Sequence, residues 1–223
     1  MPVRFGDWTA YFFAVMLFPA VIAYFCGCFN GSVLVSKYIL RDDIRQHGSG
    51  NAGLTNFHRT FGGLLTFVVI LCDVLKMVIA VVIATRLMGD TEAAKYWAGL
   101  FVLLGHMFPV MFHFKGGKGI LSGGTLAIMI DWRVALVVWG GWLVLLVLTR
   151  YVSLGSVWAG GSFPFVSWAC FPRQPFVIVL AFLTGGLVVW QHRANIVRLM
   201  HGTENKFYLR GKPAQPPTKG EGK

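Results

Sequence analysis

The amino-acid sequence predicts an all-α integral membrane protein with seven transmembrane helices, its amino terminus outside and its carboxyl terminus in the cytoplasm. Two observations predict this fold. Hydrophobic residues make up 56% of the 223 residues and charged residues only 13%, whereas a soluble domain usually carries about 25% charged residues. In addition, apolar stretches recur along most of the chain, and a spanning helix needs about 20 apolar residues. This balance argues against a soluble globule and against a disordered chain.

The elements follow from the apolar stretches in order. No charged residue occurs between Asp7 and Lys37, so a first span begins there, with a bend expected at Pro19. The third stretch is stopped by Pro109, and the fourth is short. The seven predicted spans are residues 11–35, 62–87, 94–110, 117–130, 134–148, 153–170 and 176–192.

The distribution of positive charge predicts the orientation. The chain has 20 Lys and Arg against 9 Asp and Glu, a net charge of +11. Seven spans put fourteen of the Lys and Arg on one side and five on the other, with Lys76 inside a span. Because basic loops stay in the cytoplasm, the richer side is predicted to be cytoplasmic. In a membrane protein such charge favours anionic lipid or an anionic substrate over nucleic acid.

The chain is predicted to form one membrane domain over residues 1–209, followed by a basic, disordered tail over residues 210–223. Its four cysteines show neither a disulfide framework nor metal-ligand spacing, so they are read as packing residues. The sequence predicts no metal, no cofactor and no obligatory protein partner.

A glycine-rich segment follows the first predicted span and reads GSGNAGLTNFHR at positions 48–59. Three glycines in six residues let the backbone turn tightly, and successive N–H groups in such turns bind anions. Ser49, Thr55 and Asn56 add hydrogen-bonding side chains, and Arg59 can bind a phosphate through two parallel hydrogen bonds. This composition favours a phosphate site over a plain interhelical loop.

A second segment, GHMFP at positions 105–109, leads into FKGGKG at 114–119. Lys115 and Lys118, set among glycines at the start of a predicted helix, indicate a second anion site. It is not a Walker motif, because Gly119 stands where Ser or Thr would follow the lysine. Among apolar neighbours, His106 is read first as a histidine hydrogen-bonded inside the bundle.

A third segment, QHRANIVRL at positions 191–199, would place His192 and Asn195 on one face if it is helical. Histidine can accept a proton near neutral pH.

Two further groups of polar residues lie outside these three segments. Arg150-Tyr151-Val152-Ser153 is read as an interfacial anchor, and Asp73 with Lys76, three residues apart within a predicted span, is read as a structural ion pair.

These segments resemble the bacterial acyl-phosphate:glycerol-3-phosphate acyltransferase family. The matching positions are 48–51, 53, 55, 56 and 59, then 105, 106, 109 and 114–119, then 150–153, then 192, 193, 195, 196, 198, 199 and 202–204. Their order along the chain makes the match specific. The sequence departs from the family pattern at Leu54, at Ala194 and at the run from Ile120 to Ser122.

The resemblance implies a seven-helix enzyme of the bacterial inner membrane that begins phospholipid synthesis. It would transfer a fatty acyl group from acyl phosphate to the sn-1 hydroxyl of glycerol-3-phosphate, without coenzyme A, giving lysophosphatidic acid and inorganic phosphate. The implied glycerol-3-phosphate site consists of Ser49, Arg59, Lys115 or Lys118, His192 and Asn195, among which His192, Asn195 and Ser49 are the candidate catalytic residues. The implied acyl-phosphate site consists of Gly50, Asn51, Gly53, Thr55, Asn56, Gly116 and Gly117.

Chemistry agrees with this implication, because acyl phosphate is a mixed anhydride whose leaving group is already good. Holding two anionic substrates together can contribute about 7–11 kcal/mol. Either His192 or a substrate phosphate oxygen could take the hydroxyl proton. The alternatives are a transporter or channel for an organic phosphate and a non-catalytic membrane protein. No His-x-x-x-x-Asp motif of the soluble-type acyltransferases occurs.

Overall fold

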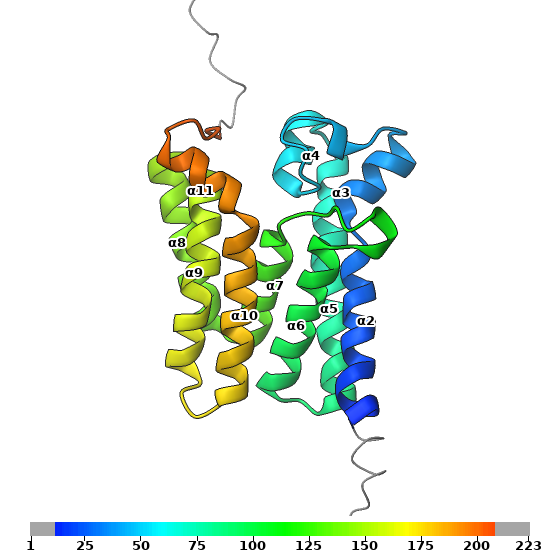
Figure 1. The fold of residues 1–223 in the computed structure, drawn as a ribbon, viewed down its shortest axis with the longest axis vertical. Coiled ribbons are helices and arrows are strands. Elements are labelled where there is room, and N and C mark those ends of the chain that lie inside the picture. The colour runs from blue at the N-terminus through cyan, green and yellow to red at the C-terminus, as the bar shows by residue number, and fades with distance from the viewer. Residues whose placement is uncertain (1–11, 208–223) are drawn as a thin grey trace, which may run out of the picture.

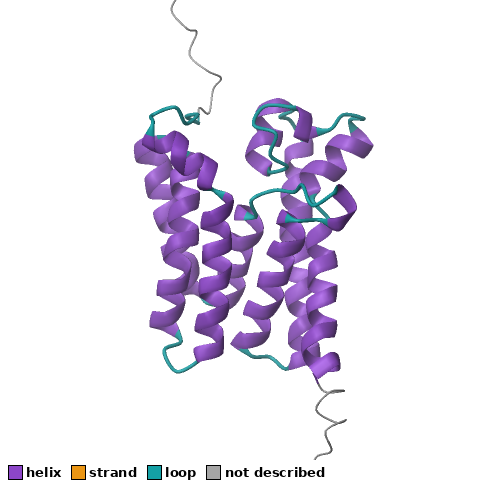
Figure 2. Cartoon of the chain, viewed as in Figure 1, coloured by secondary structure: helices purple, strands orange, loops and turns teal. Residues whose placement is uncertain are grey.

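The computed structural model describes residues 12–207. The secondary structure over this range is helical, with loops between the helices and no strand (Figure 2). The predicted tail over residues 210–223 and the first residue of the first predicted span, Tyr11, lie outside the described residues. The helices run roughly side by side as one bundle (Figure 1).

Except for α2, which covers only the middle of the first predicted stretch, the long helices agree with the predicted apolar stretches to within a few residues. They are α2 (Phe18–Cys28), α5 (Leu65–Met88), α6 (Glu92–Met107), α7 (Ile120–Ile130), α8 (Trp132–Thr149), α9 (Val152–Cys170) and α10 (Pro175–Gln191). Shorter elements lie between and beside them: η1 (Phe12–Leu17), α3 (Gly31–Leu34), η2 (Val35–Ile39), η3 (Ile44–Gln46), α4 (Leu54–Thr60), η4 (Val110–Phe112) and α11 (Arg193–Met200).

The first predicted span is a broken helix, and its bend is not at Pro19. Helix axes before and after the break at Phe29 and Asn30 differ by 42°. Pro19 lies where η1 passes into α2, inside the continuous helical piece from Phe13 to Cys28 that precedes this break. Asn30 restarts the helix, because its side chain accepts a hydrogen bond from the Val33 N–H at 3.2 Å. The predicted bend at Pro19 was therefore wrong.

Among the described helices, α5, α6 continued through η4, and α8 are long and apolar enough to cross a bilayer, and two bent pairs raise the number to five. The pairs are the broken first helix and α10 with α11. The apolar surface supports a membrane location. Only Val134 and Val138 of α8 are buried, and its exposed side chains include Leu136, Leu143, Val147 and Leu148.

Helix α7 has 11 residues, about 16 Å of helix, and is too short for a hydrocarbon core of about 30 Å. This short helix corresponds to the fourth predicted span, which is also short in the sequence. In Figure 1, α7 stops short of the end of the bundle at which α4 and α11 lie. The segment from Val110 to Gly119 takes the place of the missing turns.

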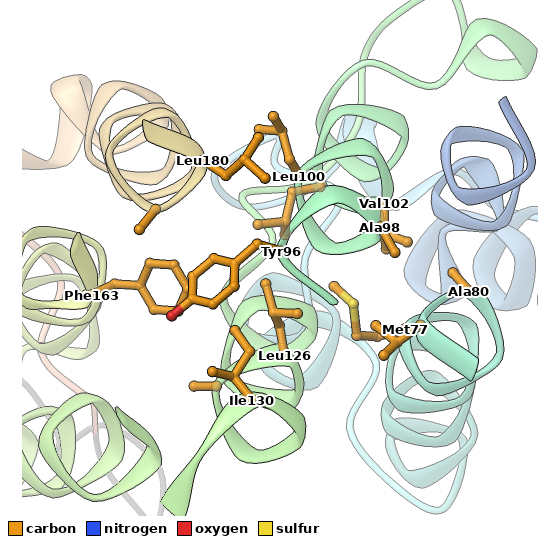
Figure 3. Packing of buried hydrophobic residues seen from close by; sticks show 14 of the residues in the cluster. Met77, Ala80, Tyr96, Ala98, Leu100, Val102, Leu126, Ile130, Phe163 and Leu180 are labelled. Atoms are coloured by element: carbon orange, nitrogen blue, oxygen red, sulfur yellow. The ribbon is translucent and has the colours of Figure 1, made fainter. Parts of the chain in front are cut away.

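The main core is built around α6. Tyr96 packs against Phe163 of α9, with Met77 of α5, Leu126 of α7 and Leu180 of α10 close by (Figure 3). A second buried cluster packs α3, η3 and α4 against the first turns of α5, and its members are Val33, Val35, Ile44, Ala52, Phe57, Val69 and Phe112. The second cluster fixes the glycine-rich segment at one end of the bundle.

Candidate active site

A cavity of about 460 Å³ is lined by residues of α4, α11 and several other segments. Helices α4 and α11 lie at the same end of the bundle (Figure 1). All three predicted segments contribute to its wall, together with α5, α6, α8 and α9. It is lined by Ser49, Asn51, Leu54, Thr55, Asn56, Arg59, Asp73, His106, Lys118, Gly119, Ile120, Leu121, Trp139, Trp142, Val152, Ser153, Ser156, His192, Asn195, Arg198, Glu204 and Asn205. Segments more than 150 residues apart in sequence, from Ser49 to Asn205, thus meet at one site.

Asn56 organises the glycine-rich loop. Its buried side chain donates to the carbonyls of His47 (2.9 Å), Asn51 (3.1 Å) and Ile44 (3.3 Å), and its Oδ1 accepts from the Ser49 N–H at 3.0 Å. The loop needs left-handed backbone at Gly48 and Gly50, with φ of 57° and 69°. Because Asn56 uses both ends of its amide inside the protein, it shapes the loop.

The remaining residues of the first segment divide between the cavity and its support. Ser49 and Arg59 are exposed side chains in the cavity wall, and Asn51 and Thr55 also line it. Gly50 and Gly53 do not line it. The loop therefore presents hydroxyl, amide and guanidinium groups, while the two glycines set its path.

In the second segment only one lysine reaches the cavity. Lys118 lines it, whereas Lys115 is exposed and lines a separate shallow depression. The N–H groups of Gly116 and Gly117 donate to the carbonyls of Met107 and His106, both at 3.1 Å. The glycines are thereby tied to the end of α6, and α7 begins directly after Lys118 and Gly119, as the sequence predicted.

Lys118 is the central cation of the site. Its Nζ donates to Asn195 Oδ1. Burial, helped by the nearby positive charge of Arg198, lowers the pKa of Lys118 to about 8, although Glu204 opposes the shift. An anion in the cavity would favour the protonated form, since opposite charges stabilise each other at short range.

The third segment places His192 at a 55° break between α10 and α11. His192 is buried, and its Nδ1 lies 2.8 Å from the carbonyl of Val188. A carbonyl can only accept, so Nδ1 carries the proton, and Nε2 of the neutral ring has a free lone pair. Such a ring is oriented to accept a proton at Nε2.

Asn195 is held from two sides on α11. Its Oδ1 faces Lys118 and its Nδ2 donates to Glu204 Oε1 at 3.1 Å. The other oxygen of Glu204 accepts from Arg198 Nε at 2.8 Å. The segment that follows α11 is fixed by the Phe207 N–H, which donates to the Arg150 carbonyl at 2.7 Å. His192 and Asn195, which the sequence was expected to place on one face, both line the cavity.

The cavity carries positive charge and unused hydrogen-bond donors. Arg59, Lys118 and Arg198 line it together with two carboxylates, of which Glu204 is paired with Arg198 and Asp73 with Lys76. Trp142 Nε1 and Ser153 Oγ are buried in its wall with no hydrogen-bond partner among the described residues. Such an arrangement suits an anionic ligand that also offers hydrogen-bond acceptors.

A family profile described as glycerol-3-phosphate acyltransferase matches residues 17–202, most of the chain. The chain belongs to the glycerol-3-phosphate acyltransferase family. It is therefore an integral membrane acyltransferase of lipid biosynthesis, as the sequence predicted.

Similar proteins extend over nearly the same length. Glycerol-3-phosphate acyltransferases of Clostridioides difficile and Thermoanaerobacter pseudethanolicus are 42% and 40% identical, and each match covers 84% of this chain and 93% of the relative. The one from Gloeobacter violaceus is 36% identical over 96% of this chain and 98% of the relative. The crystal structure of PlsY (YgiH), an integral membrane glycerol 3-phosphate acyltransferase, in its glycerol 3-phosphate form has a TM-score of 0.77 at 36% identity, covering 86% of this chain and 95% of that one. Its lysophosphatidic acid form has a TM-score of 0.74 with the same identity and coverage.

Several cavity residues of this acyltransferase were not singled out as site residues from the sequence. They are Asp73, His106, Trp142, Ser153, Arg198 and Glu204. Asp73 and Lys76 do form the predicted ion pair, at 2.6 Å. Arg198 and Glu204 had a sequence signal, because both belong to the matching third segment. Trp142 had none, since one tryptophan in an apolar helix looks like any other.

The departures from the family pattern fall in two places. Leu54, Ile120 and Leu121 line the cavity, whereas Ala194 is exposed on α11 and does not line it. The cavity-lining departures are therefore the ones that alter the shape of the site.

Proposed function

We propose that this acyltransferase moves a fatty acyl group from acyl phosphate to the sn-1 hydroxyl of glycerol-3-phosphate. The products are lysophosphatidic acid and inorganic phosphate, the first step of phospholipid synthesis. The observation that supports this proposal most strongly is that three separate polar segments meet at one cation-rich cavity. Two substrates that each bear a phosphate need such a concentration of positive charge.

The proposed reaction is a direct transfer. The glycerol-3-phosphate hydroxyl oxygen bonds to the acyl carbon, and the bond from that carbon to the phosphate oxygen breaks with its electron pair leaving on phosphate. The hydroxyl proton passes to His192 Nε2 or to the departing phosphate. His192 has the appropriate tautomer for the first route, because Nδ1 is engaged by the Val188 carbonyl. Neither a covalent nucleophile nor a cofactor is required by this chemistry.

Glycerol-3-phosphate is proposed to bind between the first and third segments. Ser49 and Arg59 line one side of the cavity, and Lys118, His192 and Asn195 line the other. Asn195 is oriented by Glu204 and so could direct the hydroxyl toward the acyl carbon. The similar PlsY structure is described in a glycerol 3-phosphate form, which supports this acceptor.

Acyl phosphate is proposed to bind at the glycine-rich loop. Asn51 and Thr55 reach the cavity directly. Gly50, Gly53 and Asn56 contribute by setting the loop, and Gly116 and Gly117 by packing the second segment on α6. The apolar walls formed by Leu121, Trp139 and Val152 offer a surface for the acyl chain.

The enzyme is proposed to lie in the bacterial inner membrane with seven crossings and the cavity facing the cytoplasm. In support, the first and last described residues lie at opposite ends of the bundle, as an odd number of crossings requires (Figure 1). Lys and Arg are concentrated at the cavity end. Five of the crossings have candidate spans by length and composition. The other two would be α9 and the short α7 completed by the segment that precedes it.

A direct assay tests the reaction. Purified protein receives palmitoyl phosphate and labelled glycerol-3-phosphate, with no coenzyme A. We expect labelled lysophosphatidic acid and one phosphate released per product. If palmitoyl coenzyme A alone supports transfer, the proposed donor is wrong, and flux of glycerol-3-phosphate into liposomes without product would favour a transporter.

A lysine pair gives the assay a matched control. Lys118→Ala should raise the Michaelis constant for glycerol-3-phosphate at least tenfold, since a charge-assisted hydrogen bond contributes about 1.5–3 kcal/mol. Lys115→Ala should leave it within about twofold, because that side chain is exposed outside the cavity. Equal effects of the two substitutions would remove Lys118 from its proposed role.

A further inference from the structure

A buried cluster of Asp73, Lys76 and His106 lies beneath the cavity, and the proposed reaction makes no use of it. The Lys76 ammonium lies 2.6 Å from Asp73 Oδ1, 2.6 Å from His106 Nδ1 and 3.3 Å from the Phe29 carbonyl. All three side chains are at most 5% exposed. Asp73 and His106 nevertheless form part of the cavity wall.

The hydrogen bonds of Lys76 determine where the imidazole proton sits. A lysine ammonium has three N–H donors and no acceptor. Its three partners here are a carboxylate, a carbonyl and an imidazole nitrogen, so each takes one proton. His106 Nδ1 must therefore be the unprotonated, accepting nitrogen, and the ring proton is on Nε2.

A glycine, Gly117, lies next to His106 Nε2. A side chain at position 117 would collide with Nε2, and it would also lie 2.6 Å from the Ala52 carbonyl. That carbonyl already accepts a hydrogen bond from Asn30 Nδ2 at 3.0 Å. Among the described residues Nε2 has no hydrogen-bond partner, and the ring belongs to the cavity wall. Nε2–H is thus an oriented donor available to a ligand.

We propose that His106 Nε2–H donates to the carbonyl oxygen of the acyl phosphate and stabilises the negative charge that develops there during transfer. Asp73 and Lys76 are positioning residues that fix the tautomer. This inference rests on the proposed function. A neutral donor fits this oxygen, because a carbonyl oxygen carries little charge before attack and much more afterwards. The phosphates, which are charged throughout, are matched by Arg59, Lys118 and Arg198.

The first test reads the tautomer without any activity measurement. In protein labelled with ¹⁵N-histidine, the His106 ring signals are those lost in His106→Gln. Nε2 should show the shift and the one-bond proton coupling of a protonated nitrogen, and Nδ1 those of an unprotonated one. A proton on Nδ1, or a charged ring, would overturn the inference even if the enzyme is fully active.

The second test uses two amides of different length. In His106→Asn the amide reaches the position of Nδ1 only, so Lys76 keeps a partner and the donor is lost. In His106→Gln the amide reaches the position of Nε2. We expect kcat to fall on the order of 10²-fold for Asn with little change in KM, and Gln to recover at least tenfold. His201→Asn, at an exposed histidine outside the cavity, should match the parent.

The outcomes separate the two proposals. An inactive parent protein means that the proposed reaction is wrong, whereas an active parent with an unaffected His106→Asn variant means that only the role of His106 is wrong. A double variant, Asp73→Leu with Lys76→Met, removes both charges and so leaves no buried charge unpaired. In this double variant the His106 ring should show a mixture of both tautomers, and kcat should fall about as far as in His106→Asn. A retained Nε2–H signal with a parental kcat would exclude the positioning role.

Discussion

At the residue scale, two histidines face one cavity in opposite tautomers. His192 donates from Nδ1 to the Val188 carbonyl and so offers a lone pair at Nε2. His106 accepts at Nδ1 from Lys76 and so offers a proton at Nε2. One ring is suited to take the hydroxyl proton and the other to hold an oxygen that gains charge. Backbone and side-chain partners, rather than different residue types, produce this division.

The pKa of about 8 for Lys118 makes a prediction about pH. A protonated Lys118 is needed to hold phosphate, and the pH dependence of kcat/KM reports the free enzyme. The kcat/KM for glycerol-3-phosphate should therefore fall above about pH 8, approaching tenfold per pH unit. At saturating substrate, the bound phosphate raises the pKa of Lys118, so the fall in kcat should begin at higher pH.

The control for this pH dependence is Lys118→Arg. Arginine stays protonated above pH 12, so the alkaline fall in kcat/KM should move out of the accessible range even if the variant is slower overall. Spontaneous hydrolysis of the acyl phosphate is measured in parallel without enzyme. An alkaline fall at the same pH in both proteins would assign it to another group.

Much of this site was predictable from the sequence, because phosphate chemistry requires particular residue types close together. Glycines with Ser49, Arg59, Lys118 and Asn195 gave that signal. The choice between Lys115 and Lys118 was not predictable, since it depends on the path of the loop onto α6. The role of His106 depends on contacts among α2, α5 and α6, and no local pattern reports them.

At the element scale, glycines and one proline set how closely α9 and α10 approach. Pro164 has no N–H, so the Gly160 carbonyl, one turn earlier in α9, has no helical partner. Gly185 of α10 packs against that carbonyl: a Cβ there would lie 2.5 Å from it and 2.7 Å from Pro164 Cδ. Close backbone approach through small residues is typical of membrane helices.

Adjacent glycines in α10 provide a matched test of this packing. Gly185→Ala should lower the apparent Tm, because overpacking costs about 1–3 kcal/mol. Gly186→Ala should leave the Tm unchanged or raise it, since Gly186 is exposed with nothing within 4 Å and alanine favours a helix by about 1 kcal/mol. Thermal unfolding of both variants in one detergent gives the comparison. Equal shifts would show that the contact with Gly160 does not limit the approach.

Hydropathy predicted the long helices because apolar length alone decides them. It failed where the first span is interrupted, at Phe29 and Asn30, since that break lies inside a continuous apolar stretch. The second break, at His192, lies where the seventh span was predicted to end. The second break shapes the cavity, because the 55° turn directs α11 over it and brings Asn195 to Lys118.

At the scale of the whole molecule, the short α7 explains how a polar cavity can extend into an apolar bundle. Its 11 residues leave room that the loop before it and the cavity occupy. Lys118 and the first residues of α7 thereby meet α4 and α11 at one end (Figure 1). A water-soluble phosphate can enter from that end, while an acyl chain can reach the same cavity along apolar helices.

The orientation proposed for the bundle makes the last prediction. In a cysteine-free background that retains activity, a single cysteine replaces Asp90, exposed between α5 and α6, or His201, exposed at the end of α11. A membrane-impermeant maleimide added to intact spheroplasts should label Asp90→Cys, and His201→Cys only after permeabilisation. The basic residues around the cavity favour this direction because moving them across the bilayer is costly. Labelling of His201→Cys in intact cells would place the cavity outside, away from substrates made in the cytoplasm, and the proposed function would fail with the orientation.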